Sequence, residues 1–232
     1  MLMLKPPLLL LHGAVGASSQ FDFLLPLLGE RYEVHRLDFE GHGASPPRAR
    51  PFRTEHFAEN VAEYLDRNPI ESVDIFGYSL GGYVALYLAH AQPQRVRRIA
   101  TLGTKFDWDP EGAAREVRQL DPQKIREKVP QFARALEARH AAAGWENVLG
   151  RTREMMTALG EQRAVTPELL GGIPHRVRIG VGDRDSLVTL EESQAAYRSL
   201  PQGELEVLPG TPHPLEKIPP ARLARYVMEF FD

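Results

Sequence analysis

A serine flanked by glycines stands in the segment Gly77-Tyr78-Ser79-Leu80-Gly81. The segment follows an apolar run, residues 73–76, that is typical of a buried strand, and a helical pattern begins at Leu80. A serine on a tight strand-to-helix turn projects its hydroxyl clear of the backbone, and the turn closes only if the residues two positions away are small. A glycine-rich phosphate loop is the alternative, but the Lys-Ser or Lys-Thr pair that ends such a loop is missing. The segment therefore predicts a nucleophile at Ser79.

A serine hydroxyl is a poor nucleophile until a base removes its proton, so Ser79 requires a histidine that a carboxylate orients. The acidic candidates Asp183 and Asp185 come directly after the apolar run 177–181, and His213 follows the weaker apolar run 205–208. With a nucleophile turn of this kind the chain order is serine, acid, histidine. His213 is therefore predicted as the base and one of the two aspartates as the acid.

The composition excludes several other kinds of chemistry. The chain has no cysteine, which rules out disulfides, zinc-thiolate sites and a cysteine nucleophile. Its 28 Lys and Arg against 31 Asp and Glu give a net charge of -3, so we expect no nucleic-acid partner. The histidines outside the motif loops show no metal-ligand spacing, and we expect neither a metal nor a cofactor.

The chain of 232 residues is 43% apolar and 25% charged, an ordinary composition for a soluble protein with a packed core. Near the N-terminus Lys5 precedes a short apolar run, residues 8–11, but this run is shorter than the apolar part of a signal peptide and prolines interrupt the segment. No stretch approaches the ~20 apolar residues that span a bilayer. We therefore expect a cytoplasmic protein without a membrane partner.

Buried-strand patterns alternate with helical patterns along most of the chain. Short apolar runs that suit strands buried on both faces cover residues 8–11, 34–39, 73–76, 96–102 and 177–181, with 205–208 as a weaker sixth. Helical patterns cover residues 21–28, 56–65, 80–90, 191–199 and 221–231, and Ser19 with Asp22 is expected to cap the first. The alternation predicts an α/β fold, a mostly parallel doubly wound sheet whose ligand site lies at the carboxyl ends of the strands.

The alternation fails once, in residues 105–172, where no strand pattern occurs. A helical bundle attached for stability is one interpretation of this insertion, and a lid over the site is the other. The insertion leaves and re-enters the core at the carboxyl ends of two strands, which favours the lid. We thus expect a core of residues 1–104 and 173–232 and a helical cap of residues 105–172. The apolar residues that recur there at helical spacing are Ile125, Val129, Phe132 and Leu136, then Leu149, Met156 and Leu159.

Four motifs, in register with this alternation, resemble those of the α/β-hydrolase superfamily over essentially the whole chain. Leu11-His12-Gly13-Ala14 is similar to the family's oxyanion loop, and Gly41-His42-Gly43-Ala44-Ser45 to the turn after its next strand. The turn around Ser79 resembles the family's nucleophile elbow, and the pattern Gly182-x-x-Asp185-x-x-Val188 with His213 completes the set. The resemblance implies an α/β-hydrolase fold with a helical cap inserted after the sixth strand.

The resemblance also implies roles for individual residues. The family places its acid three residues after the glycine, which indicates Asp185 rather than Asp183. Asp107 is a third candidate, because some members carry the acid after the earlier strand. The backbone N–H groups of Ala14 and Leu80 would then form the oxyanion hole that stabilises the developing negative charge.

The function that the resemblance implies is hydrolysis of a small-molecule carboxylic ester by a serine carboxylesterase. His213 would deprotonate Ser79, an acyl-enzyme would form, and water would release the acid. A carbon-carbon bond hydrolase, a lactonase or a cofactor-free perhydrolase using the same triad is the alternative. A non-catalytic binding protein is less favoured, because such members usually lose a triad residue and this chain retains all three.

Residues near the predicted site are candidates for substrate contact. The segment 104–108 enters the insertion beside the catalytic loops, so Phe106 and Trp108 are expected to line the pocket. Lys105 would attract a carboxylate or phosphate on the substrate, unless it is solvated or pairs with Asp107 or Asp109. Two motif-loop residues, Tyr78 and Val188, complete the predicted substrate contacts.

Overall fold

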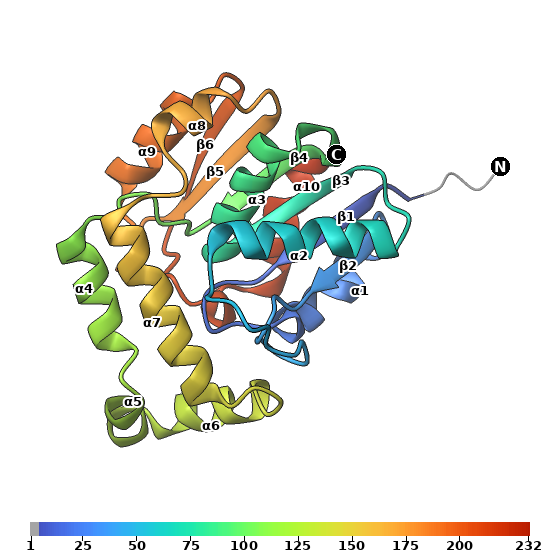
Figure 1. The fold of residues 1–232 in the computed structure, drawn as a ribbon. Helices are drawn as coiled ribbons and strands as arrows, with labels where there is room; N and C mark the ends of the chain where they lie inside the picture. The colour runs from blue at the N-terminus through green and yellow to red at the C-terminus, as the bar shows by residue number, and fades with distance from the viewer. Residues whose placement is uncertain (1–4) are drawn as a thin grey trace.

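The computed structural model describes residues 5–232, and these contain one sheet of six parallel strands with helices on both faces (Figure 1). All five neighbouring pairs in the order β2-β1-β3-β4-β5-β6 are parallel. The sheet confirms the α/β fold that the apolar runs predict, although β2 ends two residues before its run does. The strands are β1 (Pro7–Leu11), β2 (Glu33–Leu37), β3 (Val73–Tyr78), β4 (Val96–Leu102), β5 (Arg176–Gly182) and β6 (Gly203–Leu208).

Successive side chains of β1 enter different cores, because side chains alternate across a strand. Leu9 and Leu11 pack in the core beneath α2 (Thr54–Arg67), α3 (Leu80–Ala91) and α9 (Leu190–Ser199). Leu8 and Leu10 pack on the other face with α10 (Pro220–Phe231). Figure 1 shows α2 and α3 on the viewer's side of the sheet and α10 behind it. Burial on both faces explains why the runs are continuously apolar.

The first helical segment differs from its prediction. It is a 3-10 helix, η1 (Ser18–Leu24), that continues into the short helix α1 (Leu25–Leu28). The expected cap by Ser19 is wrong, because Ala17 occupies the N-cap position and its N–H donates to the Gln20 side chain at 3.1 Å. Two further 3-10 turns are η2 (Pro93–Arg95) and η3 (Leu215–Lys217).

Five helices lie between β4 and β5, and the paired helices α4 and α7 stand apart from the sheet in Figure 1. Within residues 5–232 the insertion follows the fourth strand, β4. The prediction that it follows a sixth strand is therefore wrong. The spacing from Ile125 to Leu136 belongs to two helices, because Pro130 begins a new one, and Val129 is 48% exposed. The bounds are α4 (Pro110–Gln119), α5 (Pro122–Lys128), α6 (Pro130–Arg139), α7 (Trp145–Glu161) and α8 (Pro167–Gly171).

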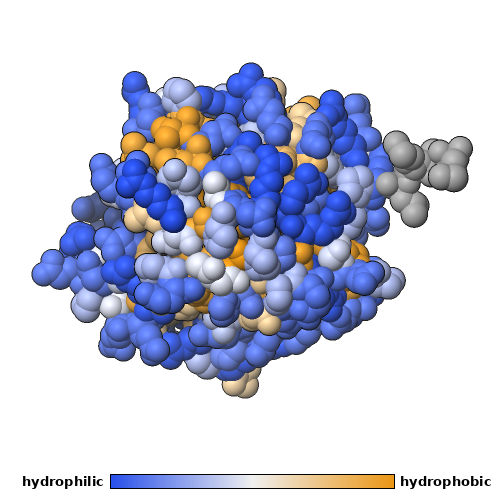
Figure 2. All heavy atoms as spheres, turned by 90° about the horizontal axis from the view of Figure 1, so that it is seen from above, coloured by the Kyte–Doolittle hydropathy of each residue, from blue (hydrophilic) through white to orange (hydrophobic). Residues whose placement is uncertain are grey.

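Figure 2 shows one face of the molecule, mostly hydrophilic, with hydrophobic residues gathered in small patches between polar ones. Small apolar patches of this kind are normal on a folded domain. Within residues 5–232, no helix is long and apolar enough to cross a membrane.

Candidate active site

Ser79 lies between β3 and α3 with φ 52° and ψ -117°, a backbone conformation that L residues rarely adopt. The turn is closed so tightly that a Cβ on Gly77 would lie 2.4 Å from the Gly82 nitrogen. A Cβ on Gly81 would lie 2.1 Å from the Leu11 carbonyl oxygen. Backbone atoms cannot give way as a flexible side chain can, so both positions require glycine. Ser79 therefore lies on a tight turn between a strand and a helix, as the sequence predicts, and its role as nucleophile stays a prediction.

His213 and Asp185 meet beyond the carboxyl ends of β5 and β6. The His213 Nδ1 and Asp185 Oδ2 atoms are 2.7 Å apart, and the Asp185 side chain is almost fully buried. The other carboxylate oxygen accepts N–H groups of Leu187 and Val188 at 2.8 and 2.9 Å. These bonds fix the carboxylate, and the carboxylate fixes the orientation of the imidazole.

The two other candidate acids are engaged elsewhere. Asp183 Oδ1 accepts the Thr211 N–H at 3.1 Å, which is a turn-capping contact. Asp107 pairs with Arg163 at 2.8 Å and is exposed. Of the three, Asp185 is the one whose carboxylate contacts His213.

Ser79 and His213 line the same cavity of about 270 Å³. Four of the five expected substrate contacts line it too: Tyr78, Lys105, Trp108 and Val188. The fifth, Phe106, lies instead in a separate groove of about 350 Å³ beside α9, whose lining includes neither Ser79 nor His213. We place the candidate site in the cavity of about 270 Å³, because Ser79 and His213, the groups that can do chemistry, line it.

Lys105 contacts neither Asp107 nor Asp109, the two partners expected for it. Its Nζ atom donates to the Leu187 carbonyl at 3.3 Å and lies 3.9 Å from Glu192, rather than beside Asp107 or Asp109. Its side chain is only 19% exposed. Lys105 therefore presents a partly neutralised cation to the cavity.

The insertion supplies wall residues that sequence reasoning missed. Those with polar side chains include Glu116, whose pKa is raised above its usual range by burial. Phe132 and Met156 belong to the helical spacing that predicts the insertion, but that spacing does not reveal which side chains face a cavity. The missed residues of the insertion are Glu116, Gln119, Leu120, Phe132, Arg139 and Met156.

A second, smaller cavity of about 40 Å³ also opens at Ser79. Ala14 and Leu80, the expected oxyanion donors, are part of its lining, together with apolar side chains that include Met155 and Leu159. Leu80 is the first residue of α3, so its N–H has no intrahelical acceptor and is available to a ligand. Ser79 thus lies where a larger and a smaller cavity meet.

The expected oxyanion loop is a tight turn in which the Gly16 N–H donates to the Gly13 carbonyl at 3.0 Å. His12 Nδ1 contacts the same carbonyl at 2.8 Å, and its Nε2 accepts the Phe39 N–H at 3.2 Å. The Phe39 bond requires that the proton be on Nδ1, which then donates to Gly13. These bonds restrain the carbonyl side of the peptide plane that carries the Ala14 N–H.

Three buried histidines lie together behind this turn. The ring centroids of His12 and His42 are 5.2 Å apart, and those of His42 and His140 are 5.7 Å apart. Burial lowers the pKa of His12 to about 4 and also lowers the pKa values of His42 and His140. All three rings are therefore neutral near pH 7, and their hydrogen bonds have defined directions.

Known proteins resemble this chain in sequence and in fold. A pimeloyl-[acyl-carrier protein] methyl ester esterase of Neisseria meningitidis serogroup C is 40% identical over 111 residues, covering 45% of this chain and 41% of the relative. The matched part thus spans about two fifths of the relative's length. The hydrolase of 2-hydroxy-6-oxo-6-phenylhexa-2,4-dienoate from Rhodococcus superposes with a TM-score of 0.80 and 24% identity, covering 98% of this chain and 90% of that one.

A thermophilic esterase from Thermogutta terrifontis superposes with a TM-score of 0.78 and 21% identity, covering 98% of this chain and 90% of that one. At such identities these structural likenesses show the fold alone. The family model described as alpha/beta hydrolase fold matches residues 6–171, which include the turn around Ser79. This match spans most of the chain, and the chain belongs to the α/β hydrolase fold family.

Proposed function

We propose that this chain hydrolyses a small-molecule carboxylic ester, with Ser79 as nucleophile, His213 as base and Asp185 as the acid that orients His213. The observation that carries the proposal is the 2.7 Å contact of His213 with a buried Asp185 in a cavity that Ser79 also lines. A histidine held in this way has its Nε2 free to accept a proton.

In the proposed reaction His213 Nε2 takes the Ser79 hydroxyl proton as the serine oxygen attacks the ester carbonyl. The N–H groups of Ala14 and Leu80 stabilise the oxyanion of the tetrahedral intermediate. The protonated His213 then donates its proton to the leaving alcohol, and an acyl-enzyme remains. His213 then takes a proton from water as the water oxygen attacks the acyl carbonyl. It returns this proton to the Ser79 oxygen as the bond between serine and acyl group breaks and the acid is released.

The two cavities support a proposal for the shape of the substrate. The cavity of about 40 Å³ beside the expected oxyanion donors is much the smaller of the two, and we assign the alcohol group of the ester to it. The cavity of about 270 Å³ takes the larger part of the ester, against walls that carry both apolar and charged side chains. The name of the Neisseria relative specifies a methyl ester, which has such a small group. We therefore propose methyl and ethyl esters of larger acids as substrates.

We also propose that residues 105–172 form a cap that selects the substrate. Lys105, Trp108, Phe132, Arg139 and Met156 all line the larger cavity and all come from this segment. The core supplies the reacting groups, whereas the insertion supplies much of the wall against which the substrate lies.

The experiment is a panel of methyl, ethyl, butyl and benzyl esters of one aliphatic dicarboxylic acid, with wild type and Ser79→Ala. The methyl and ethyl esters should be hydrolysed fastest, and Ser79→Ala should be inactive on all of them. A fluorophosphonate probe should label wild type at Ser79, since only an activated serine reacts at a useful rate. Labelling that persists in Ser79→Ala contradicts the proposal, and a preference for benzyl esters contradicts the assignment of the small cavity.

A further inference from the structure

The end of α6 contacts the turn that carries Ala14. His140, the residue after α6, has its Nε2 2.9 Å from the Val15 carbonyl oxygen. Arg139, the last residue of α6, donates from Nη1 to the same oxygen at 3.2 Å. Two consecutive residues of the insertion therefore hold one carbonyl of the core, next to an expected oxyanion donor.

The carbonyl that they hold belongs to a strained residue. Val15 has φ 51°, in the left-handed region that favours glycine and that a β-branched residue rarely adopts. It occupies the third position of the turn closed by Gly13 and Gly16, where certain turn types require a positive φ. Such a conformation persists only where the surroundings hold it, because relaxation is favourable by about 1–3 kcal/mol.

A bond on the other side of the ring fixes the direction of the His140 contact. The Gly43 N–H donates to His140 Nδ1 at 3.1 Å, so the proton is on Nε2 and points at Val15. Gly43 has φ 54°, and a Cβ there would lie 2.3 Å from Asp38 Oδ2. The same oxygen accepts the Ala44 N–H at 3.0 Å. The backbone that orients His140 is therefore itself held closely.

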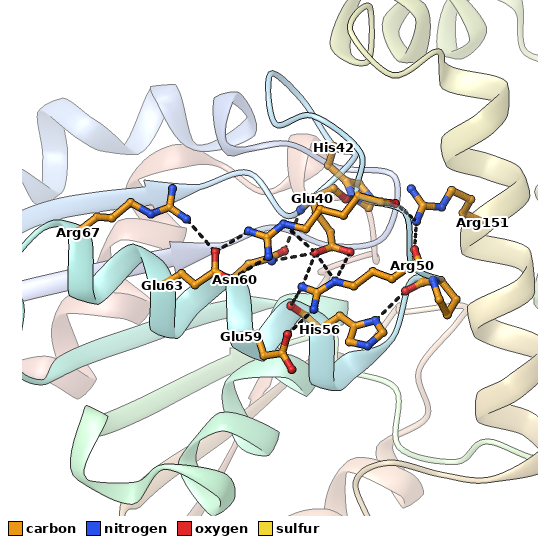
Figure 3. A network of polar contacts seen from close by, with 11 residues as sticks. Glu40, His42, Arg50, His56, Glu59, Asn60, Glu63, Arg67 and Arg151 are labelled. Carbon is orange, nitrogen blue, oxygen red and sulfur yellow. Dashed lines mark hydrogen bonds and ion pairs between the residues drawn. The ribbon is translucent and has the colours of Figure 1, made fainter.

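The loop that contains Gly43 is anchored by the polar network of Figure 3. The buried Glu40 carboxylate accepts from Arg50 Nε at 3.0 Å and from Asn60 Nδ2 at 3.0 Å. Figure 3 also shows Arg151 reaching from α7 to the backbone of this loop, where it donates to the Arg48 carbonyl at 3.2 Å and to that of Arg50. The insertion therefore contacts a rigid part of the core at this end.

We propose that His140, assisted by Arg139, is a positioning residue that holds the Val15 carbonyl and thereby keeps the Ala14 N–H aimed at the oxyanion. The proposal rests on the proposed function, because it assigns the Ala14 N–H to the oxyanion hole. It makes the insertion part of the catalytic geometry as well as a wall for the substrate.

His140 is a cleaner probe of this role than Arg139. The Arg139 guanidinium lines the cavity and also pairs with Glu216 at 3.4 Å, so its replacement changes substrate contact as well. His140 is fully buried and does not line the cavity that Ser79 and His213 share. A change at His140 therefore reaches the reaction through Val15.

Two replacements of His140 separate its two hydrogen bonds. Asparagine places a polar atom near the position of Nδ1 and lacks the reach of Nε2, so His140→Asn keeps the Gly43 bond and loses the Val15 bond. Glutamine reaches the Nε2 position, so His140→Gln keeps a donor to Val15. With the ester that wild type turns over best, His140→Asn should lower kcat by roughly 10- to 100-fold with KM within threefold, since an oxyanion donor acts in the transition state. His140→Gln should restore most of kcat.

The strain at Val15 provides a second, independent test. Glycine adopts a positive φ without strain, so in a Val15→Gly background the turn no longer depends on the contacts of His140 and Arg139 with this carbonyl. His140→Asn should then lower kcat less than threefold relative to Val15→Gly alone. An equal loss in both backgrounds overturns the proposal, and so does an unchanged kcat of His140→Asn in the wild-type background. If His140→Asn folds only in the Val15→Gly background, the comparison with Val15→Gly alone still decides, because a loss of more than tenfold there overturns the proposal.

The control is His175→Asn, because His175 contacts the Pro93 carbonyl and does not line the cavity. The kcat of His175→Asn should equal that of wild type. Amide hydrogen exchange of residues 13–16 separates this inference from the proposed function. Exchange should be faster in His140→Asn than in wild type, even if wild type hydrolyses no ester and Ser79 is not labelled. Absence of ester hydrolysis and of Ser79 labelling would contradict the proposed esterase function alone. Unchanged exchange in His140→Asn would contradict the proposed role of His140.

Discussion

The turn around Ser79 and the helices of the insertion meet at one cavity, but they are constrained in different ways. At the turn, backbone atoms lie so close that Gly77 and Gly81 have no room for a Cβ. In α7 of the insertion, a Cβ on Gly150 would meet nothing within 4 Å. The turn thus tolerates almost no change in residue type at these two positions. Helix α7 has room at Gly150 but not at Gly160, where a Cβ would lie 2.6 Å from the Ala113 Cβ.

This difference explains which parts of a site a sequence reveals. A residue type that steric exclusion demands leaves a pattern at fixed spacing, such as glycine two residues before and after Ser79. A wall residue such as Glu116 or Arg139 needs only to lie on the correct face of a helix, and many residue types satisfy that condition. The groups that we propose to react can therefore be predicted from the sequence, whereas the substrate cannot.

The largest expected effect tests the core side of this comparison. Ser79→Ala and His213→Ala should each lower kcat by roughly 10⁵-fold, because the nucleophile and its base act as a unit. The double variant should lose no more than either single one, as steady-state rates on the preferred methyl ester would measure. A loss of less than about tenfold in His213→Ala would assign the base to another residue.

The next effect distinguishes the two neighbouring aspartates. Asp185→Asn should lower kcat by roughly 10³-fold, because an amide at this position stabilises neither the tautomer nor the protonated form of His213. Asp183→Asn is the matched control, since Asp183 contacts the Thr211 N–H rather than a ring. Its kcat should stay within threefold of wild type, and the reverse ranking would move the acid to Asp183.

The sequence predicts the sheet, most of its helices and the family, because each depends on local patterns of apolar residues and glycine. It does not predict the break at Val129 within one helical spacing, or that Phe106 faces a different groove from Trp108 two residues away. It also gives no indication that His140 contacts Val15, 125 residues earlier in the chain. Contacts of this kind depend on how helices pack, which a one-dimensional pattern does not contain.

The buried histidines His12, His42 and His140, which lie where the core meets the insertion, should make the free energy of unfolding depend on pH. Burial lowers the pKa of His12 to about 4, whereas a histidine in the unfolded chain titrates near ~6.5. Between these values the unfolded chain binds more protons than the folded one, so the free energy of unfolding falls as the pH falls. By pH 5 His12 alone should account for a loss of about 2 kcal/mol.

His42 and His140 act in the same direction, since burial lowers their pKa values too. Urea unfolding at pH 7.5 and pH 5 measures the change. His42→Asn removes one of the three buried rings and should reduce the difference in the free energy of unfolding between the two pH values. His56→Asn, which replaces a ring outside this cluster that contacts the Pro51 carbonyl, is the control. Equal pH dependence in wild type and His42→Asn would show that other groups cause it.

The smallest expected effect tests the tolerance of the insertion with two glycines of the same helix. Gly150 lies inside α7, where alanine is the better helix former, and its replacement meets no atom within 4 Å. Gly150→Ala should therefore raise the free energy of unfolding by about 1 kcal/mol. Gly144, at the N-cap of the same helix, has equally open surroundings but a φ of 77°. Gly144→Ala should lower the free energy of unfolding by about 1 kcal/mol, because alanine is strained there. Since neither Cβ has a neighbour, opposite signs would show that backbone conformation decides the outcome. A loss at both positions would mean that α7 packs more tightly at Gly150 than these distances indicate, and a gain at both would contradict the strain expected at Gly144.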